Sequence, residues 1–159
     1  PDPRFAGTVL YMVHHDAHGA MGLIVNRPLG DGPLDKLVKG FGLDPGRATG
    51  TVTLHYGGPV ETDLLLVLHT PDWRGPATRG DAGPLALTAD PGVFAALAEG
   101  GGPSRYLVAV GYAGWGPGQL EAEMARQDWL TAPATAGFVF DGDAESKWDR
   151  ALALAGTTL

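Results

Sequence analysis

Apolar residues recur along this chain with two periods, near two in some segments and near 3.6 in others. Segments of about four to eight residues that are rich in β-branched and aromatic side chains predict strands. The predicted strands cover residues 8–14, 20–25, 51–56, 64–68, 84–88, 106–110 and 138–140. A polar turn joins the first two into a predicted hairpin. The continuously apolar run 64–68 is predicted to be central and buried on both faces.

Apolar residues three and four positions apart predict helices between these strands. One helix follows Pro33, and another is capped by Asp90 with Pro91 in its first turn. The predicted helices cover residues 34–41, 91–99, 117–127 and 143–156. The last one carries an apolar stripe formed by Trp148, Ala151, Leu152 and Ala155.

Glycine, proline and polar residues separate these elements. Residues 71–83 have no period and form the longest predicted loop, which we expect to be the most mobile segment. Residues 111–118 are predicted to form a glycine-rich turn between a strand and a helix. Strands mixed with helices, in a chain of 159 residues, indicate one domain over residues 1–159, of α+β or mixed α/β class.

Composition narrows the range of functions. The formal net charge is −7, and the 11 lysines and arginines are spread singly along the chain, so direct nucleic-acid binding is not expected. The cysteine count of 0 excludes disulfides, thiolate metal ligands and cysteine nucleophiles. No apolar run approaches the roughly 18 residues needed to span a bilayer, and the start does not resemble a signal peptide. We therefore expect a soluble, cytoplasmic protein without a membrane segment.

Three segments, in this order, resemble the AlgH/YqgE family of bacterial proteins. They are residues 19–29 (GAMGLIVNRPL), 57–60 (GGPV) and 111–115 (GYAGW), with shorter similar stretches at 68–70, 118–121 and 129–133. The resemblance covers nearly the whole chain and implies a single α+β domain, whose mixed sheet is split and curled into a pseudo-barrel flanked by helices. Members are often labelled transcriptional regulators, and the family has no settled biochemical activity.

The sequence departs from this family in two places. Members typically carry one more apolar strand before the stretch at 2–5, so either the sheet has an uncovered edge or that strand is missing from this sequence. Relatives also often place an arginine where this chain has the acidic residues 61–63, which weakens an anion-binding role for that loop.

The run 111–118 and the helix after it have the parts of an anion site, namely a strand, a turn and a helix start. Gly114 and Gly116 would need a third glycine at position 119 for a dinucleotide fingerprint, but that residue is Gln119. The chain also lacks a Gly-Lys-Ser/Thr phosphate loop. A tight turn is therefore favoured. Glu121 and Glu123 are two residues apart and face different sides of a helix, so they are not an acid/base pair.

Histidines suggest chemistry in two regions. His14, His15, Asp16 and His18 are a candidate metal set in the first hairpin. Neighbours in a strand face opposite sides, however, and only His15 falls where the family motif has a histidine, so neither a metal nor a cofactor is expected. His69 lies beside a strand, where a hydrogen-bonded core histidine is the more common outcome.

One pocket is predicted, at the ends of strands and in the glycine-rich segments. Arg27 offers a fork for a carboxylate or phosphate, although a capped turn with a surface charge is an equal alternative. Trp115 is the tryptophan expected to line a pocket. The predicted pocket residues are Asn26, Arg27, Gly57, Gly58, Tyr112, Trp115 and Gln119.

We expect a non-enzymatic regulatory or small-ligand-binding domain that acts indirectly, through a protein partner or a small anionic ligand. One alternative is an enzyme that acts on a small anionic substrate, with His15 or His69 as acid/base and Arg27 as the clamp. A second alternative is a structural protein-interaction module that uses a sheet edge or an apolar patch. No catalytic residue is assigned, and the sequence leaves the oligomeric state open.

Overall fold

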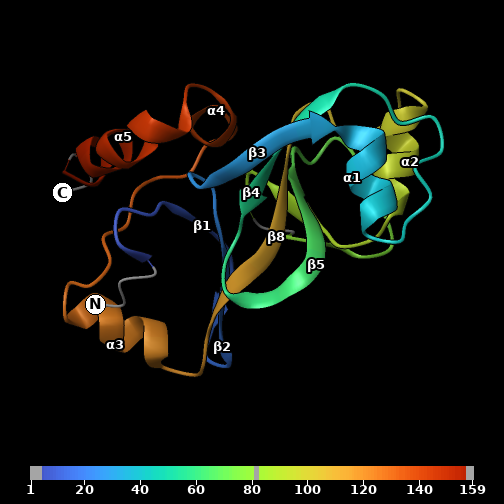
Figure 1. Ribbon diagram of the computed structural model, residues 1–159. Coiled ribbons are helices and arrows are strands. Elements are labelled where there is room, and N and C mark those ends of the chain that lie inside the picture. Colours follow the sequence, from blue (N-terminus) through green and yellow to red (C-terminus); the bar gives the residue numbers. More distant parts are fainter. Residues whose placement is uncertain (1–4, 81–82, 157–159) are drawn as a thin grey trace.

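A computed structural model describes residues 5–80 and 83–156, which form an α+β fold (Figure 1). The strands are β1 (Leu10–Asp16), β2 (Gly19–Ile24), β3 (Pro28–Pro33), β4 (Thr51–Tyr56), β5 (Val60–His69), β6 (Thr78–Arg79), β7 (Ala86–Thr88) and β8 (Tyr106–Trp115). The helices are α1 (Leu34–Gly40), α2 (Gly92–Ala98), α3 (Gln119–Ala125), α4 (Ala136–Phe140) and α5 (Ala144–Gly156). Within these residues, no helix is both long and apolar enough to cross a membrane.

The sheet is organised around β8, which has three neighbouring strands. The strand order is β1-β2-β8-β5-β7-β6, and the hairpin β3–β4 joins it through β4. Strands β2 and β5 pair antiparallel with β8, whereas β4 pairs parallel with its residues 108–110. Strand β2 takes over at residues 113–115, so the sheet splits in two along one edge of β8. The curled, nearly closed sheet confirms the split pseudo-barrel of α+β class expected from the family resemblance.

Glycines allow two backbones to cross where the sheet splits. Gly111 has φ +73°, and a Cβ on it would overlap the carbonyl of Gly58. Gly58 has φ +155°, and a Cβ on it would overlap the backbone of Tyr112. Strand β8 therefore continues through Gly111 to Trp115, and the prediction of a turn over 111–118 was wrong for most of that run. Only residues 116–118 form the connection to α3.

Two apolar cores lie on opposite faces of the sheet. Leu66 belongs to the core that includes Val139 of α4. Its neighbour Val67 belongs to the core that includes Val38 of α1 and Phe94 of α2. Figure 1 shows the same division, with α1 and α2 at one end of the sheet and α4 and α5 at the other. Because successive strand residues point to opposite faces, the run 64–68 is buried on both sides, as predicted.

The prediction of a strand at 138–140 was wrong, because this segment is the helix α4. The Thr135 hydroxyl accepts the backbone N–H of Phe138 at 3.1 Å, which is an N-cap. A run of three apolar residues has no period that could distinguish a helix from a strand. Gly137 also lowers the helix propensity of the α4 segment.

The other predicted elements agree with the structure to within a few residues, with two exceptions. Strand β3 was missed because Pro28 and two glycines do not resemble a strand, although proline is tolerated at a first strand position. The loop predicted over 71–83 contains the short strand β6. Residues 81 and 82 of that loop lie outside the described residues.

Candidate functional site

Asn26 and Arg27 hold the segment before β1 in place. The Asn26 carboxamide accepts the backbone N–H of Val9 at 2.8 Å and donates to the carbonyl of Gly7 at 3.0 Å. The Arg27 guanidinium donates to the carbonyl of Ala6 at 2.8 Å. Both side chains therefore act on the chain's own backbone in this structure.

Gly57, Gly58 and Tyr112 lie at the crossing of the two backbones. Gly57 donates its N–H to Val110 and accepts from Ile24, which ties β2, β4 and β8 together. A Cβ on Gly57 would overlap the carbonyl of Gly111, so this point is closely packed. These three predicted residues are not in the wall of the main groove described next.

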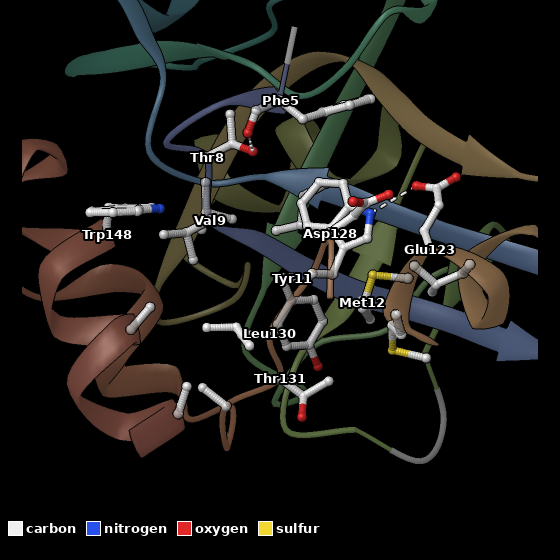
Figure 2. A pocket seen from close by; sticks show the side chains of 18 of the residues that line it. Phe5, Thr8, Val9, Tyr11, Met12, Glu123, Asp128, Leu130, Thr131 and Trp148 are labelled. Atoms are coloured by element: carbon white, nitrogen blue, oxygen red, sulfur yellow. Dashed lines mark hydrogen bonds between the residues drawn. The ribbon is translucent and has the colours of Figure 1, made fainter. Parts of the chain in front are cut away.

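Trp115 and Gln119, the remaining two predicted residues, line a groove of about 820 Å³. Its walls come from β1, from α3, from the segment 129–134 and from α5. Figure 2 shows Glu123 of α3 at one side and Trp148 of α5 at the other, with Tyr11 and Leu130 between them. The structure thus brings together two of the seven predicted pocket residues in one groove.

A hydrogen-bonded network makes one wall of the groove rigid. Oε1 of Glu123 accepts the indole N–H of Trp129 at 2.9 Å and that of Trp115 at 3.2 Å. Oε2 accepts the Gln119 amide at 3.0 Å, and Gln119 in turn accepts the N–H of Gly116 at 3.0 Å. The ring of Phe5 packs 6.3 Å from Trp115 and 5.6 Å from Trp129, measured between ring centroids. The Glu123 carboxylate is therefore occupied by donors of the protein itself.

The opposite wall and the rim are apolar and exposed to solvent. Trp148 is 42% exposed and Leu152 is 38% exposed, both on α5. Leu130, on the facing segment, is 65% exposed. Met12 and Met124 add flexible side chains that adapt to different shapes. Large apolar side chains that remain exposed in one groove mark a surface for an apolar ligand or partner.

The charged side chains of the groove do not favour an anion. Its carboxylates are Glu123 and Asp128, and its guanidinium is Arg126. Arg126 forms an ion pair with Asp128 at 3.1 Å. No histidine is found among the described residues that line this groove. The groove can therefore bind and orient a ligand, but it offers no imidazole for proton transfer.

His15 lies at the edge of the hairpin, away from the groove. Its Nε2 lies 2.7 Å from Oε1 of Glu121, and both side chains are partly exposed. This hydrogen bond lowers the pKa of Glu121. Glu121 thus contacts β1 while Glu123 contacts the tryptophans, which confirms that the two carboxylates face different sides.

His69 is fully buried in a chain of hydrogen bonds. Its Nδ1 lies 2.8 Å from the carbonyl of Thr70, which can only accept, so Nδ1 carries the proton. Nε2 then accepts from the Thr88 hydroxyl at 2.7 Å, and Thr88 is 2.8 Å from the hydroxyl of Thr78. Burial lowers the pKa of His69, and the Thr70 carbonyl opposes that shift. This is the hydrogen-bonded core histidine expected from the sequence.

Two other histidines of the first hairpin share the carboxylate of Asp16. His14 lies 3.1 Å from one oxygen of Asp16, and His18 lies 3.7 Å from the other. In the part of the chain that the structure describes, no group of three or more histidines and carboxylates could hold a metal ion.

The sequence did not identify three residues that the structure makes prominent. Glu123 was considered only as half of a carboxylate pair. In the structure its carboxylate accepts hydrogen bonds from the side chains of Trp115, Gln119 and Trp129. Trp129 was not among the predicted pocket residues. Lys147 was missed because the predicted apolar stripe of α5 runs through its neighbour Trp148 and does not include Lys147. The structure buries Lys147 to 4% exposure and exposes Trp148 instead.

Comparison with known proteins places this architecture in a group of relatives. Residues 1–159 match a protein family described as AlgH-like (DUF179). A UPF0301 protein of Methylococcus capsulatus is 46% identical over 159 residues, which cover 100% of this chain and 87% of the relative. A UPF0301 protein of Rhodospirillum rubrum is 42% identical over 155 residues, which cover 98% of this chain and 81% of the relative.

Two solved structures share the fold. The solution structure of the AlgH protein from Pseudomonas aeruginosa superimposes with a TM-score of 0.81 at 40% identity, covering 99% of this chain and 83% of that one. The crystal structure of a Corynebacterium diphtheriae protein superimposes with a TM-score of 0.65 at 21% identity, covering 90% and 74%. The second likeness shows the fold alone.

Proposed function

This chain belongs to the AlgH-like family, and we propose that it is a non-enzymatic regulatory domain that binds a small, largely apolar ligand. The proposed site is the groove between β1, α3, the segment 129–134 and α5. The observation that carries the proposal is the combination of a rigid wall, held by Glu123, with exposed apolar side chains on α5. A fixed wall orients a ligand, and the adaptable apolar wall supplies the affinity.

The size of the groove suits a small molecule. Ligand pockets commonly have volumes of about 300 to 1,000 Å³ and are mostly apolar with a few polar groups. The groove measures about 820 Å³ and combines three tryptophans with two methionines. With two carboxylates and one guanidinium in its wall, it favours a neutral or cationic ligand over an anionic one. Among the described residues that line the groove, Arg126 is the one cationic group and it pairs with Asp128, so these residues offer no unpaired cation to the anionic ligand expected from the sequence.

Regulation would be indirect in this account. A formal net charge of −7 opposes direct contact with nucleic acid. A ligand in the groove would cover Trp148 and Leu152, which are exposed without it. The surface that α5 presents to a protein partner would then differ between the two states, which is the differential contact that any ligand-dependent switch requires.

The exposed residues of α5 also support a second function, that of a protein-interaction module. Trp148, Leu152 and Leu130 together form an apolar rim that a partner could cover. Light scattering after gel filtration tests this function. A stable complex or oligomer that disperses when Trp148 is replaced would favour it, and a monomer with intact small-molecule binding would favour the ligand-binding function.

A trio of naphthalene compounds tests the proposed function. The probes are 2-naphthalenemethanol, 2-naphthylmethylamine and 2-naphthoate, which share one ring system and differ in charge. We expect the alcohol or the amine to raise the melting temperature and the carboxylate to do so least. The Trp148→Ala variant should lose the shift, whereas Trp73→Phe, in the opposite core, should keep it. Equal shifts for wild type and Trp148→Ala would overturn the assignment.

A further inference from the structure

A second cavity, of about 580 Å³, lies between the β3–β4 hairpin and the helices α4 and α5. Thr51, Thr53 and His55 line it from β4, Asp31 lines it from β3, and Lys147 lines it from α5. Alternate strand residues share one face, so the three β4 side chains lie along the same wall. Val139 is the only described residue that lines both this cavity and the groove, so the cavity is a separate site.

Lys147 is deeply buried in this cavity. Lys147 is 4% exposed, and its Nζ donates to the carbonyl of Val25 at 2.9 Å. A lysine ammonium carries three N–H donors and is rarely buried without an anionic partner. Among the ion pairs of the described residues, none joins Lys147 to a carboxylate. The position therefore disfavours the ammonium form of a lysine that lines the cavity.

Burial and one neighbouring cation act on Lys147 in the same direction. Burial, and to a smaller extent Arg150 on the same helix, lowers the pKa of Lys147. Burial also lowers the pKa of His55 in the facing wall. Asp31 accepts a hydrogen bond from the Thr53 hydroxyl and is exposed at the edge of the cavity. A lysine with a lowered pKa has a larger fraction of neutral amine, which is the nucleophilic form.

We propose that Lys147 is a nucleophilic amine that binds small carbonyl compounds covalently, as an imine, in the cavity between β3–β4 and α4–α5. The Nζ lone pair forms a bond to the carbonyl carbon, and the nitrogen loses a proton as the carbonyl oxygen gains one. The oxygen then takes the second proton of the nitrogen and leaves as water: the carbon–oxygen bond breaks as the nitrogen lone pair forms the carbon–nitrogen double bond. Amine and carbonyl compound become imine and water, so no oxidant or reductant is required.

Side chains in the same cavity can move the protons. His55 and Asp31 line it from the β3–β4 hairpin, and Tyr106 lines it from β8. Nδ1 of His55 lies 3.3 Å from the Val108 carbonyl, and the ring also interacts with the backbone of Thr53. These groups act on protons of the bound compound and amine, while Lys147 alone forms the covalent bond.

The chain provides internal controls for a trapping experiment, because its other lysines, Lys36 and Lys39, are exposed on α1. The full chain is incubated near neutral pH with pyruvate and sodium cyanoborohydride, which reduces an imine to a stable secondary amine. Peptide mass spectrometry then measures the adduct at each lysine. We expect an excess at Lys147 of about tenfold for each unit by which its pKa lies below the ordinary lysine value. A second run with butanone shows whether a carboxylate on the carbonyl compound matters.

Two results would overturn the proposal. One is an adduct on Lys36 and Lys39 with none on Lys147. The other is an adduct that Lys147 shares equally with both exposed lysines. The Lys147→Arg variant keeps a cationic donor for the Val25 carbonyl but has no nucleophilic amine, so its folded form should show only the background at Lys36 and Lys39. If this variant does not fold, the ratio among the wild-type lysines still decides.

Discussion

The indole N–H of Trp129 lies 2.9 Å from Oε1 of Glu123, and the indole N–H of Trp115 reaches the same oxygen at 3.2 Å. One carboxylate therefore joins the end of β8, helix α3 and the segment that follows it. These three segments form the rigid wall of the groove. The hydrogen bonds from the two indoles to Glu123 are the structural basis of the proposed binding site.

Replacing Glu123 by Ala should destabilise the protein. The variant leaves the buried Trp115 indole and its Trp129 neighbour without an acceptor, which costs about 1 to 3 kcal/mol in the free energy of unfolding. Urea unfolding followed by tryptophan fluorescence measures the change. Glu121→Ala is the matched control, because its solvent-exposed hydrogen bond to His15 should contribute little to stability. Equal losses in the two variants would contradict the role of Glu123.

Two leucines separate stability from binding. Leu66 is 2% exposed in the core and Leu152 is 38% exposed in the groove. We expect Leu66→Ala to cost about 2 to 5 kcal/mol of stability, and Leu152→Ala to cost less than about 1 kcal/mol. Only Leu152→Ala should weaken binding of 2-naphthalenemethanol in a titration of the folded protein. A Leu152→Ala variant that is as unstable as Leu66→Ala would place Leu152 in the core instead.

Two glycines with nearly the same positive φ should differ in tolerance to substitution. Gly111 and Gly118 have φ +73° and +74°, but a Cβ would overlap Gly58 at the first and meet no atom within 4 Å at the second. Gly118→Ala should cost about 1 kcal/mol through left-handed strain alone. Gly111→Ala adds a steric clash between two backbones and should cost several times as much. Thermal unfolding compares the two, and similar melting temperatures would argue against the crossing.

Stability should fall when the buried histidines gain a proton. Burial lowers the pKa of His69 and of His55 below the ordinary value of 6.5, so the unfolded chain binds protons more readily than the folded one. The contribution of these two histidines to the free energy of unfolding should therefore be constant above that value and decrease as the pH falls through and below it. Urea titrations from about pH 8 to about pH 5 measure the slope. Replacing His69 by Phe should reduce the slope, and an unchanged slope would contradict this assignment.

The sequence predicts most of the fold because its long elements have a clear period. The hairpin of β1 and β2, the buried strand β5 and the helix α5 are recognisable from their own residues. The three residues at 138–140 are too few to show a period, and the glycines of β8 suggest a turn. The β8 glycine at position 111 allows the backbone to cross that of Gly58, which is distant in sequence, so only the tertiary structure reveals its role.

The candidate site could be predicted only in part for the same reason. Trp115 and Gln119 line the groove, and the sequence drew attention to them because they lie within and just after the glycine-rich run. Asn26 and Arg27 donate to backbone groups about twenty residues earlier in the chain, which no local pattern indicates. The exposed stripe on α5 has the same amphipathic period as a buried one, so the sequence could not show that Trp148 faces a groove.

The indole N–H signals of the four tryptophans test the central claim most directly. In a two-dimensional ¹H–¹⁵N spectrum of the full chain, titration with 2-naphthalenemethanol should shift the signals of Trp115, Trp129 and Trp148, which line the groove. The signal of Trp73, which packs 5.6 Å from His69 in another part of the protein, should stay in place. Shifts of all four signals together, or of Trp73 alone, would contradict ligand binding in the groove.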